Sequence, residues 1–264
     1  MCKVSVIMGI YNCAATLQEA LDSLYAQTFQ DFEIILCDDG SKDDTYEIAL
    51  ANQRCHKNIV LLRNERNLGL NKTLNNCLAV AKGEYIARMD GDDISLPTRF
   101  EREVGFLDSH PEFAIVSTPM IYFDENGEFR RGSVRNQYPN KYDFISGTPF
   151  CHAPCMVRVE AYNRVGGYSE DERLLRVEDY NLWFKMYAAG YRGHILNEHL
   201  YKMRDDNNAH RRRTWKNRCN EVYCKYTGYR MIGIPWYYWI CAIKSIAVYL
   251  LPSGVYKYLH RCKS

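Results

Sequence analysis

Three carboxylates stand within four residues, at Asp90, Asp92 and Asp93, directly after an apolar segment. Like charges this close need a cation, water or hydrogen bonds to offset their repulsion. Hard divalent ions such as Mg²⁺ and Mn²⁺ bind one or two carboxylates and complete their coordination with phosphate oxygens. The spacing therefore indicates a metal site able to hold a diphosphate, and an exposed acidic turn is the alternative interpretation.

A second acidic turn, Asp38-Asp39-Gly40-Ser41, follows another apolar segment. A carboxylate at the end of a parallel strand can accept hydrogen bonds from a base N–H or a ribose hydroxyl. The chain contains neither GxGxxG nor GxxxxGK[ST], so no glycine-rich loop of either type holds phosphates. A nicotinamide dehydrogenase and a P-loop nucleotidase are therefore disfavoured.

The acidic turns need strands to position them, and the sequence predicts those strands. Short apolar, β-branched segments alternate with segments that have the apolar spacing of a helix. This alternation predicts βαβ units in a parallel sheet, where ligands bind beyond the carboxyl ends of the strands. Polar residues follow each of the four segments, so we expect them to meet in one crevice. The expected strands are 3–10, 33–37, 59–62 and 85–89, and one expected helix is 70–81.

The second half of the chain is less regular. A helix expected over 99–109 leads to a strand over 113–117, and a further helix is expected over about 179–189. Asn126-Gly127 predicts a hairpin turn in which both residues favour positive φ. The composition changes near residue 205, where the chain becomes basic and aromatic.

Six segments stand out along the chain, at 4–12, 33–45, 67–75, 83–99, 148–158 and 166–183. Together, and in this order, they resemble the family 2 glycosyltransferases of the GT-A fold, which are inverting, nucleotide-sugar-dependent enzymes of bacterial polysaccharide biosynthesis. The resemblance implies a Rossmann-like α/β fold with a mostly parallel central sheet flanked by helices. It covers about residues 1–205, with a nucleotide-binding part over about 1–97 and an acceptor part over about 98–205.

The resemblance also implies roles for the matched residues. Asp39 is expected to contact the uracil of a UDP-sugar, and Asp90 and Asp92 to form a DxD motif for Mn²⁺ or Mg²⁺, with Asp92 as the principal ligand. Arg204 and His210 are candidate diphosphate or metal contacts, although a solvated basic face is the alternative for His210. The expected nucleotide-sugar contacts are Tyr11, Asn12, Asp39, Asn67, Gly69, Arg88, Asp90, His152 and Arg204, and the expected metal ligands are Asp90, Asp92 and His210.

The same resemblance implies that Asp179 is the general base. An inverting transfer needs one carboxylate opposite the leaving diphosphate to accept the proton of the acceptor hydroxyl. The adjacent Glu178 points about 100° away on a helix, so we expect it to orient the acceptor or the base. Helix N-terminal acids stabilised by the helix dipole are the alternative for both. Asn181 stands where the family often has an acid.

Cysteine spacing bears on metals and on the cellular compartment. The segment Cys151-His152-x-x-Cys155 offers three zinc ligands at most, so a zinc site is disfavoured and His152 is interpreted as a pocket residue. The chain has 11 cysteines and no CxxC pair, which argues against a disulfide framework and favours a reducing cytosol. The N-terminus lacks the features of a signal peptide, so we expect the mature chain to begin near Met1.

Charge is distributed unevenly along the 264 residues. The whole chain has a net charge of +2, but residues 201–264 carry 13 basic and 3 acidic side chains, a net +10, which leaves −8 for the rest. Residues 231–251 combine an aromatic cluster with Pro235 and Lys244, which suits a membrane interface better than a membrane span. We therefore expect 206–264 to be a helical segment that binds anionic lipid, and packing on the catalytic domain or on a second copy is the alternative. Nucleic acid is disfavoured as a partner.

These observations predict a cytoplasmic glycosyltransferase, peripheral on the inner face of the cell membrane. It would move a sugar from a UDP-sugar to a hydroxyl of a lipid-linked surface-polysaccharide precursor, in a metal-dependent reaction. Another nucleotide-diphosphate enzyme, such as a nucleotidyltransferase, and an inactive module that binds nucleotide-sugar or glycan are the alternatives.

Overall fold

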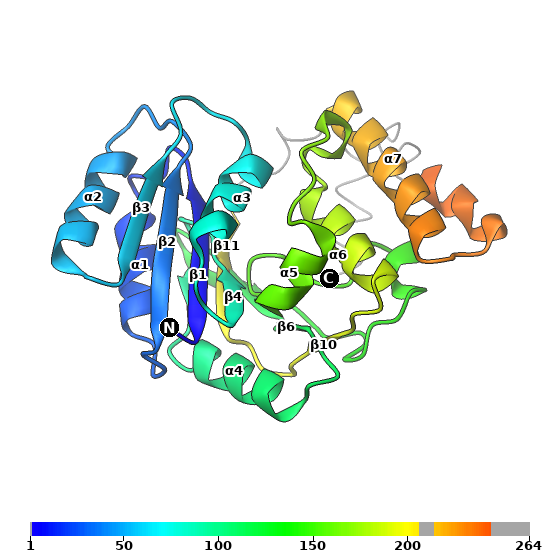
Figure 1. Ribbon diagram of the computed structural model, residues 1–264, viewed down its shortest axis with the longest axis horizontal. Helices are drawn as coiled ribbons and strands as arrows, with labels where there is room; N and C mark the ends of the chain where they lie inside the picture. Colours follow the sequence, from blue (N-terminus) through cyan, green and yellow to red (C-terminus); the bar gives the residue numbers. More distant parts are fainter. Residues whose placement is uncertain (1, 206–213, 244–264) are drawn as a thin grey trace.

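The computed structural model describes residues 2–205 and 214–243 (Figure 1). A seven-stranded sheet forms the centre of the fold. Within it β9 is antiparallel to both of its neighbours and the other pairings are parallel, which confirms the expected mostly parallel α/β architecture. In spatial order the strands are β10 (Gly193–Ile195), β6 (Ile115–Ser117), β9 (Met156–Arg158), β4 (Tyr85–Arg88), β1 (Val4–Ile10), β2 (Phe32–Asp38) and β3 (Ile59–Arg63).

Helices cover both faces of this sheet, so its central strands are buried on both sides. In β2, Ile34 and Leu36 point into one core and Ile35 and Cys37 into the other, as the alternation of side chains along a strand requires. The first core contains residues of α1 (Leu17–Tyr25), α2 (Thr45–Cys55) and α4 (Arg99–Ser109). The second contains residues of α3 (Leu70–Val80), α5 (Val159–Val165) and α6 (Glu178–Ala188).

A smaller sheet lies beside the central one, in the order β5 (Ile94–Ser95), β11 (Tyr201–Arg204), β7 (Met120–Asp124) and β8 (Gly127–Arg131). The hairpin predicted at Asn126-Gly127 joins β7 to β8. Gly127 has a φ of 113°, but Asn126 does not have a positive φ, so that part of the expectation was wrong. The Asn126 N–H donates to Asp124 Oδ1 at 2.7 Å, and this local hydrogen bond favours a different turn.

The described part of the C-terminal segment packs on the α/β body. Helix α7 (Trp215–Met231) lies against α6 and the short helix η2 (Glu172–Leu174), and it leads to η4 (Trp236–Ile243) at the right of Figure 1. A Cβ at Gly228 would clash with the Phe184 ring, so glycine allows α7 to approach α6 closely. Over the described residues, we find no helix with the length and hydrophobicity needed to span a bilayer. Residues 244–251 of the predicted membrane-binding stretch lie outside the described residues.

Candidate active site

A cleft lies beyond the carboxyl ends of β1, β2 and β4 and consists of two adjoining cavities. The nucleotide-side cavity, of about 540 Å³, lies where the sequence predicted a crevice for the polar residues that follow the strands. The base-side cavity, of about 650 Å³, shares five lining residues with it: Leu70, Asp90, Arg176, Glu178 and Asn217. Of the predicted site residues, the first is lined by Tyr11, Asp39, Asn67, Gly69, Asp90, Asp92 and Glu178, and the second by Arg88, Asp90, His152, Glu178 and Asp179.

The acidic turn after β4 gathers three carboxylates. One oxygen from each of Asp90, Asp92 and Asp93 lies within 4.8 Å of the others, and Asp90 and Asp92 line the nucleotide-side cavity. Asp93 is buried and accepts hydrogen bonds from Tyr201 Oη at 2.9 Å and Arg204 N at 2.8 Å. Burial and the two neighbouring carboxylates raise the pKa of Asp93 to about 8. The oxygen donors therefore fit a hard divalent cation, with Asp90 and Asp92 open to the cleft.

Asp39 organises the loop between β3 and α3. Its carboxylate accepts hydrogen bonds from Leu68 N at 2.8 Å, Gly69 N at 3.0 Å and Asn64 Nδ2 at 2.8 Å. Gly69 has a φ of 93°, a conformation that favours glycine. Asp39 thus fixes the backbone of Leu68 and Gly69, which follow Asn67 at the cleft, and lines the cavity itself.

Tyr11 and Asn12 occupy different positions although they are adjacent. Tyr11 is 43% exposed and lines the nucleotide-side cavity. Asn12 is not among the residues that line either cavity. Its Oδ1 accepts a hydrogen bond from Lys42 N at 2.9 Å and its backbone N–H donates to Ser41 Oγ at 3.0 Å. Asn12, with a φ of 49°, therefore joins the loops that follow β1 and β2.

Asp179 and Glu178 lie in the first turn of α6, as the sequence predicted. Burial and the charge of Glu178 raise the pKa of Asp179 to about 6, although the Tyr180 N–H donates to its Oδ1 at 2.7 Å. Burial also raises the pKa of Glu178, whose Oε2 is buried and has no hydrogen-bond partner among the residues that the structure describes. An acid with a pKa near 6 that faces a cleft is suited to accept a proton near neutral pH.

Arg88 and His152 lie between these acidic groups in the base-side cavity. Arg88 is buried and forms an ion pair with Asp90. His152 Nε2 lies 2.7 Å from Tyr168 Oη, and burial and the charge of Arg88 lower its pKa well below its usual value. His152 is therefore a neutral pocket residue. Beside His152, Cys155 Sγ donates to Cys151 O at 2.8 Å.

Arg204 supports the acidic turn from outside the two cavities. Its Nε donates to Asp92 O at 2.9 Å, and its Nη2 pairs with Glu19. Neither cavity is lined by Arg204, so in this structure it contacts the backbone of the acidic turn rather than the cleft. His210 lies outside the described residues.

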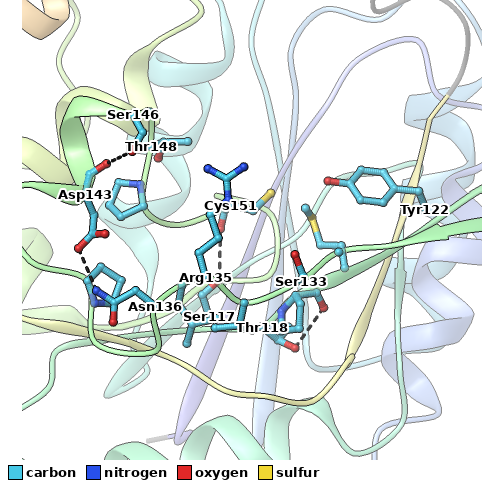
Figure 2. Close-up of a pocket in the computed structure, with 18 residues that line it drawn as sticks. Ser117, Thr118, Tyr122, Ser133, Arg135, Asn136, Asp143, Ser146, Thr148 and Cys151 are labelled. Atoms are coloured by element: carbon cyan, nitrogen blue, oxygen red, sulfur yellow. Dashed lines mark hydrogen bonds between the residues drawn. The ribbon is translucent and has the colours of Figure 1, made fainter. Parts of the chain in front are cut away.

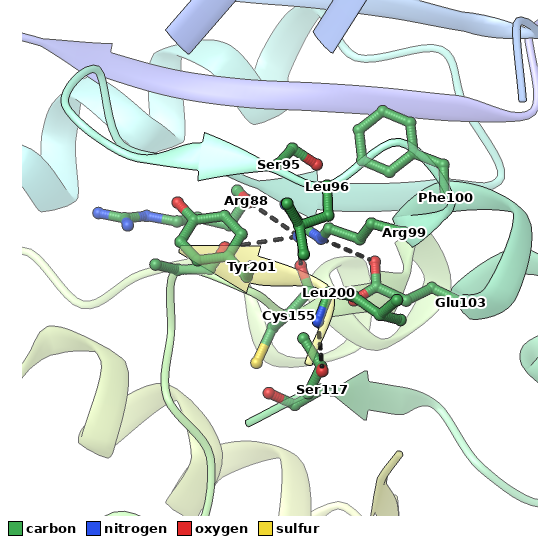
Figure 3. Close-up of polar contacts among 12 residues, drawn as sticks. Arg88, Ser95, Leu96, Arg99, Phe100, Glu103, Ser117, Cys155, Leu200 and Tyr201 are labelled. Carbon is green, nitrogen blue, oxygen red and sulfur yellow. Dashed lines mark hydrogen bonds and ion pairs between the residues drawn. The ribbon is translucent and has the colours of Figure 1, made fainter. Parts of the chain in front are cut away.

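A buried arginine, Arg99, joins the two segments that carry Arg88 and His152 (Figure 3). Its Nη2 donates to Arg88 O at 3.1 Å and to Cys155 O at 3.4 Å, and its Nε pairs with Glu103 Oε2 at 3.1 Å. Arg99 and Glu103 are both fully buried. Our sequence interpretation did not single out this pair, although an i,i+4 spacing of opposite charges was visible in the predicted helix.

Polar residues of α7 also line the cleft and were not predicted. Lys216, Asn217 and Asn220 line the nucleotide-side cavity, and Arg218 and Glu221 line the base-side cavity. Asn220 Nδ2 donates to Leu175 O at 3.0 Å. The i, i+1 and i+4 spacing of the first three residues places them on one helix face, which is the signal that could have identified them.

Comparison with known proteins identifies the family. Residues 5–166 match the family model described as glycosyl transferase family 2. A putative glycosyltransferase of Bacillus subtilis (strain 168), EpsE, is 39% identical over 260 residues, which cover 98% of this chain and 93% of the relative. An Escherichia coli protein is 30% identical over 98% of this chain and 95% of its own length, and is named UDP-Gal:alpha-D-GlcNAc-diphosphoundecaprenol beta-1,3-galactosyltransferase.

Solved structures match the fold. Staphylococcus aureus TarS 1-349 in complex with UDP-GlcNAc has a TM-score of 0.72 and 21% identity, over 94% of this chain and 71% of that one. The mannosyltransferase PcManGT from Pyrobaculum calidifontis, in complex with GDP-Man and Mn²⁺, has a TM-score of 0.67 and 18% identity, over 99% and 79%. These proteins share the GT-A fold. Because the family model spans more than half of the chain and the relatives align along nearly all of it, the chain is a glycosyltransferase and belongs to glycosyl transferase family 2.

Proposed function

We propose that this glycosyltransferase transfers a sugar, with inversion, from a UDP-sugar to a hydroxyl of a lipid-linked polysaccharide precursor. The observation that carries the proposal is one continuous cleft, with Asp90 and Asp92 in the nucleotide-side cavity and Asp179 in the base-side cavity. The E. coli relative named above is described as using UDP-Gal and a diphosphoundecaprenol-linked acceptor, which supports this donor and acceptor class. Family membership disfavours the nucleotidyltransferase and inactive-module alternatives.

On the donor side, Tyr11, Asp39, Asn67 and Gly69 bind the nucleotide in our proposal. They line the same cavity as the acidic turn. Asp39 accepts three hydrogen bonds from Asn64, Leu68 and Gly69, which leaves it about one acceptor position for a base N–H. Asp90 and Asp92 would hold Mn²⁺ or Mg²⁺, which when bound neutralises the charge of a leaving diphosphate. PcManGT, which shares the fold, is described in complex with GDP-Man and Mn²⁺, and this supports a divalent metal in the proposed reaction.

On the acceptor side, Asp179 removes the proton of the attacking hydroxyl. The acceptor oxygen then forms a bond to the anomeric carbon while the bond from that carbon to the diphosphate breaks, and UDP leaves with the electron pair. Burial and the Glu178 charge raise the pKa of Asp179 to about 6, so its carboxylate is mostly ionised at neutral pH and is still basic. Arg88 is close enough to lower that pKa and so favours the ionised form.

A membrane-facing surface fits a lipid-linked acceptor. Trp236 is 78% exposed and Ile240 is 74% exposed on η4, and Tyr237 is exposed between them. Aromatic residues beside basic ones suit the interface of an anionic bilayer. Arg230, at the end of α7, supplies a basic neighbour in the sequence. We infer that η4 contacts the cytoplasmic leaflet where the acceptor resides.

Two substitutions and a matched control test the catalytic proposal. Asp179→Asn should abolish transfer and leave UDP binding intact, because the amide cannot accept the proton but keeps the shape of the carboxylate. Asp92→Ala should weaken UDP binding in the presence of Mn²⁺. Asp22→Asn, at an exposed position of α1, should behave like the unmodified protein. A normal turnover rate in Asp179→Asn would overturn the assignment of the base.

The donor sugar is identified by a screen in the same assay. UDP-glucose, UDP-galactose and their N-acetyl derivatives are compared with Mn²⁺ by thermal shift and by release of UDP. A response to none of these UDP-sugars, together with a response to a GDP-sugar, would overturn the proposed donor class.

A further inference from the structure

A third cavity, of about 280 Å³, adjoins the base-side cavity and is not explained by the donor (Figure 2). Met120, Tyr122, Thr148 and Cys151 line both cavities. Within the described parts of the chain, the third cavity shares no lining residue with the nucleotide-side cavity. A ligand in it would therefore be in contact with the acceptor side of the cleft. We call it the Arg135 cavity, after the side chain that reaches into its middle in Figure 2.

The lining of the Arg135 cavity mixes apolar side chains with polar groups of the kind that bind carbohydrates. Ser133, Ser146 and Thr148 contribute hydroxyl groups, and Asn136 contributes an amide. Hydroxyl and amide groups can donate and accept hydrogen bonds, so they match sugar hydroxyls. The exposed ring of a sugar can also lie against an aromatic residue, and Tyr122 lines the same space. The cavity is thus suited to the part of the acceptor that lies next to the sugar with the attacking hydroxyl.

Arg135 differs from its neighbours because its guanidinium is unpaired. No hydrogen bond or ion pair joins it to another residue in the described parts of the chain, 2–205 and 214–243. The nearest acid in the cavity, Asp143, instead accepts hydrogen bonds from Asn136 Nδ2 at 3.0 Å and Asn140 N at 2.7 Å. By contrast, Arg131 on the same segment pairs with Glu128 at 3.3 Å. The positive charge of Arg135 is therefore available to a ligand.

The backbone on either side of Arg135 is held in place. Gly132 N donates to Met120 O at 2.7 Å, and Ile195 N donates to Gln137 O at 2.9 Å. Asp143 fixes the following turn through Asn136 and Asn140. An anchored backbone keeps the Cα of Arg135 at the cavity, so the entropy cost of binding an anion falls mainly on its side chain. Its planar fork matches a phosphate or a carboxylate with two parallel hydrogen bonds.

We propose that the Arg135 cavity binds an anionic group of the acceptor, next to the sugar that carries the attacking hydroxyl. This inference rests on the proposed function, because it takes Asp179 to mark the acceptor side. The anion is either the diphosphate of a lipid-linked sugar or the carboxylate of an acidic sugar, and both present oxygen pairs to Arg135. The cavity thereby selects charged acceptors over neutral ones.

Binding of three probes tests the proposal without requiring turnover. The probes are N-acetylglucosamine linked through a diphosphate to an octyl chain, octyl N-acetylglucosaminide, and octyl glucuronide, each titrated in the presence of UDP and Mn²⁺. We expect one of the two anionic probes to bind about tenfold more tightly than the neutral one. Which anionic probe binds better distinguishes the diphosphate from the carboxylate source.

Variants of the same segment provide the controls. Arg135→Ala should lose the preference for the anionic probe, Arg135→Lys should keep part of it, and Arg131→Ala should keep all of it. Arg135 is exposed, so its replacement should leave the melting temperature unchanged. The proposal is overturned if the unmodified protein shows no preference for either anion, or if Arg135→Ala retains the preference. Metal-dependent UDP binding by the unmodified protein is measured in the same samples, and its absence would instead count against the proposed function.

Discussion

At the scale of single residues, Asp179 lines the cleft and has a pKa that is raised to about 6. A general base works only when ionised, so kcat/KM should fall about tenfold for each pH unit below about pH 6. The measurement is initial rates of UDP release from about pH 4.5 to about pH 8, with folding followed by circular dichroism over the same range. A rate that stays level down to about pH 4.5 while the protein remains folded would contradict the assignment.

The raised pKa of Asp179 also has a cost in stability. A carboxyl whose folded pKa exceeds its unfolded value, near 3.9, binds its proton more tightly in the folded state, so its ionisation opposes folding above about pH 6. The half-buried side chain is partly screened by solvent, and we expect a cost of about 1 kcal/mol at about pH 8.

Asp179→Asn should therefore be more stable than the unmodified protein at about pH 8, by about 2–4 °C in melting temperature. The gain should shrink as the pH falls through 6 and disappear near pH 4, where the carboxyl is protonated in both states. Differential scanning calorimetry at several pH values measures it, with Asp22→Asn as the control. An equal gain at all pH values would show that ionisation of Asp179 is not its source.

The residue types at the strand ends could be predicted, but their contacts could not. Asp39 and Asp90 lie at the cleft because acids after apolar strands mark the carboxyl edge of a parallel sheet. Arg204 and Asn12 were placed in the same site, and in the structure they bind loop backbone outside the two cavities. The loop amides and carbonyls that face a side chain are set by the packing of segments far apart in sequence. The spacing of apolar residues along the chain carries no information about that packing.

At the scale of elements, Arg99 pairs with Glu103 within helix α4 and joins that helix to the end of strand β4 through its hydrogen bond to Arg88 O (Figure 3). Arg99→Met would leave Glu103 as an unpaired acid in the core, and the pKa of Glu103 is already raised to about 7 by burial. We expect a loss of about 3–5 kcal/mol in the free energy of unfolding, measured by urea denaturation. Arg102→Met, on the same helix but in an exposed pair with Glu198, should cost less than about 1 kcal/mol.

The double variant Arg99→Met with Glu103→Leu separates two effects. One is the cost in stability of an unpaired buried charge, and the other is the role of Arg99 in positioning the backbone of Arg88 and Cys155. Removing both charges should recover part of the stability, because no unpaired charge is left in the core. Turnover should remain reduced, since Arg88 O and Cys155 O lose the donor that joins them. A double variant no more stable than Arg99→Met would contradict the account of the buried charge.

Most elements could be predicted because their signals are local. The 3.6-residue spacing in α3 and α4 and the continuous apolar runs of β1 and β2 arise within a few residues. The smaller sheet was missed apart from its hairpin, because β5 has two residues and pairs with β11, about a hundred residues further along the chain. Long-range pairing of such short strands leaves no pattern in the sequence.

At the scale of the whole molecule, helix α7 of the basic C-terminal segment has a polar face toward the cleft and an apolar face toward η4. Lys216, Asn217 and Asn220 face the nucleotide-side cavity, so α7 belongs to the catalytic cleft. Tyr223 and Tyr226 of the same helix line an apolar groove with Ile240 of η4. Helix α7 therefore separates the cleft from the apolar surface, and a lipid-linked acceptor held at that surface would have its sugar end near the active site.

This arrangement predicts binding to anionic membranes through η4. The full chain should float with vesicles that contain phosphatidylglycerol and less well with vesicles of phosphatidylcholine alone, because basic residues are attracted to anionic lipid. Raising the salt from about 0.1 M to about 1 M shortens the Debye length from about 10 Å to about 3 Å and should weaken the binding.

The double variant Trp236→Ser with Ile240→Ser should reduce flotation at least about fivefold, because it removes the two most exposed apolar side chains of η4. Both are largely solvent-exposed, so the melting temperature should change little. Phe129→Ser on β8, where the ring is 53% exposed, is the matched control and should float like the unmodified protein. Equal flotation of the double variant and the control would show that η4 does not contact the membrane. The exposed aromatic residues would then favour the other expected partner, a second copy of the chain, which analytical ultracentrifugation of the same variants would detect as a loss of dimer.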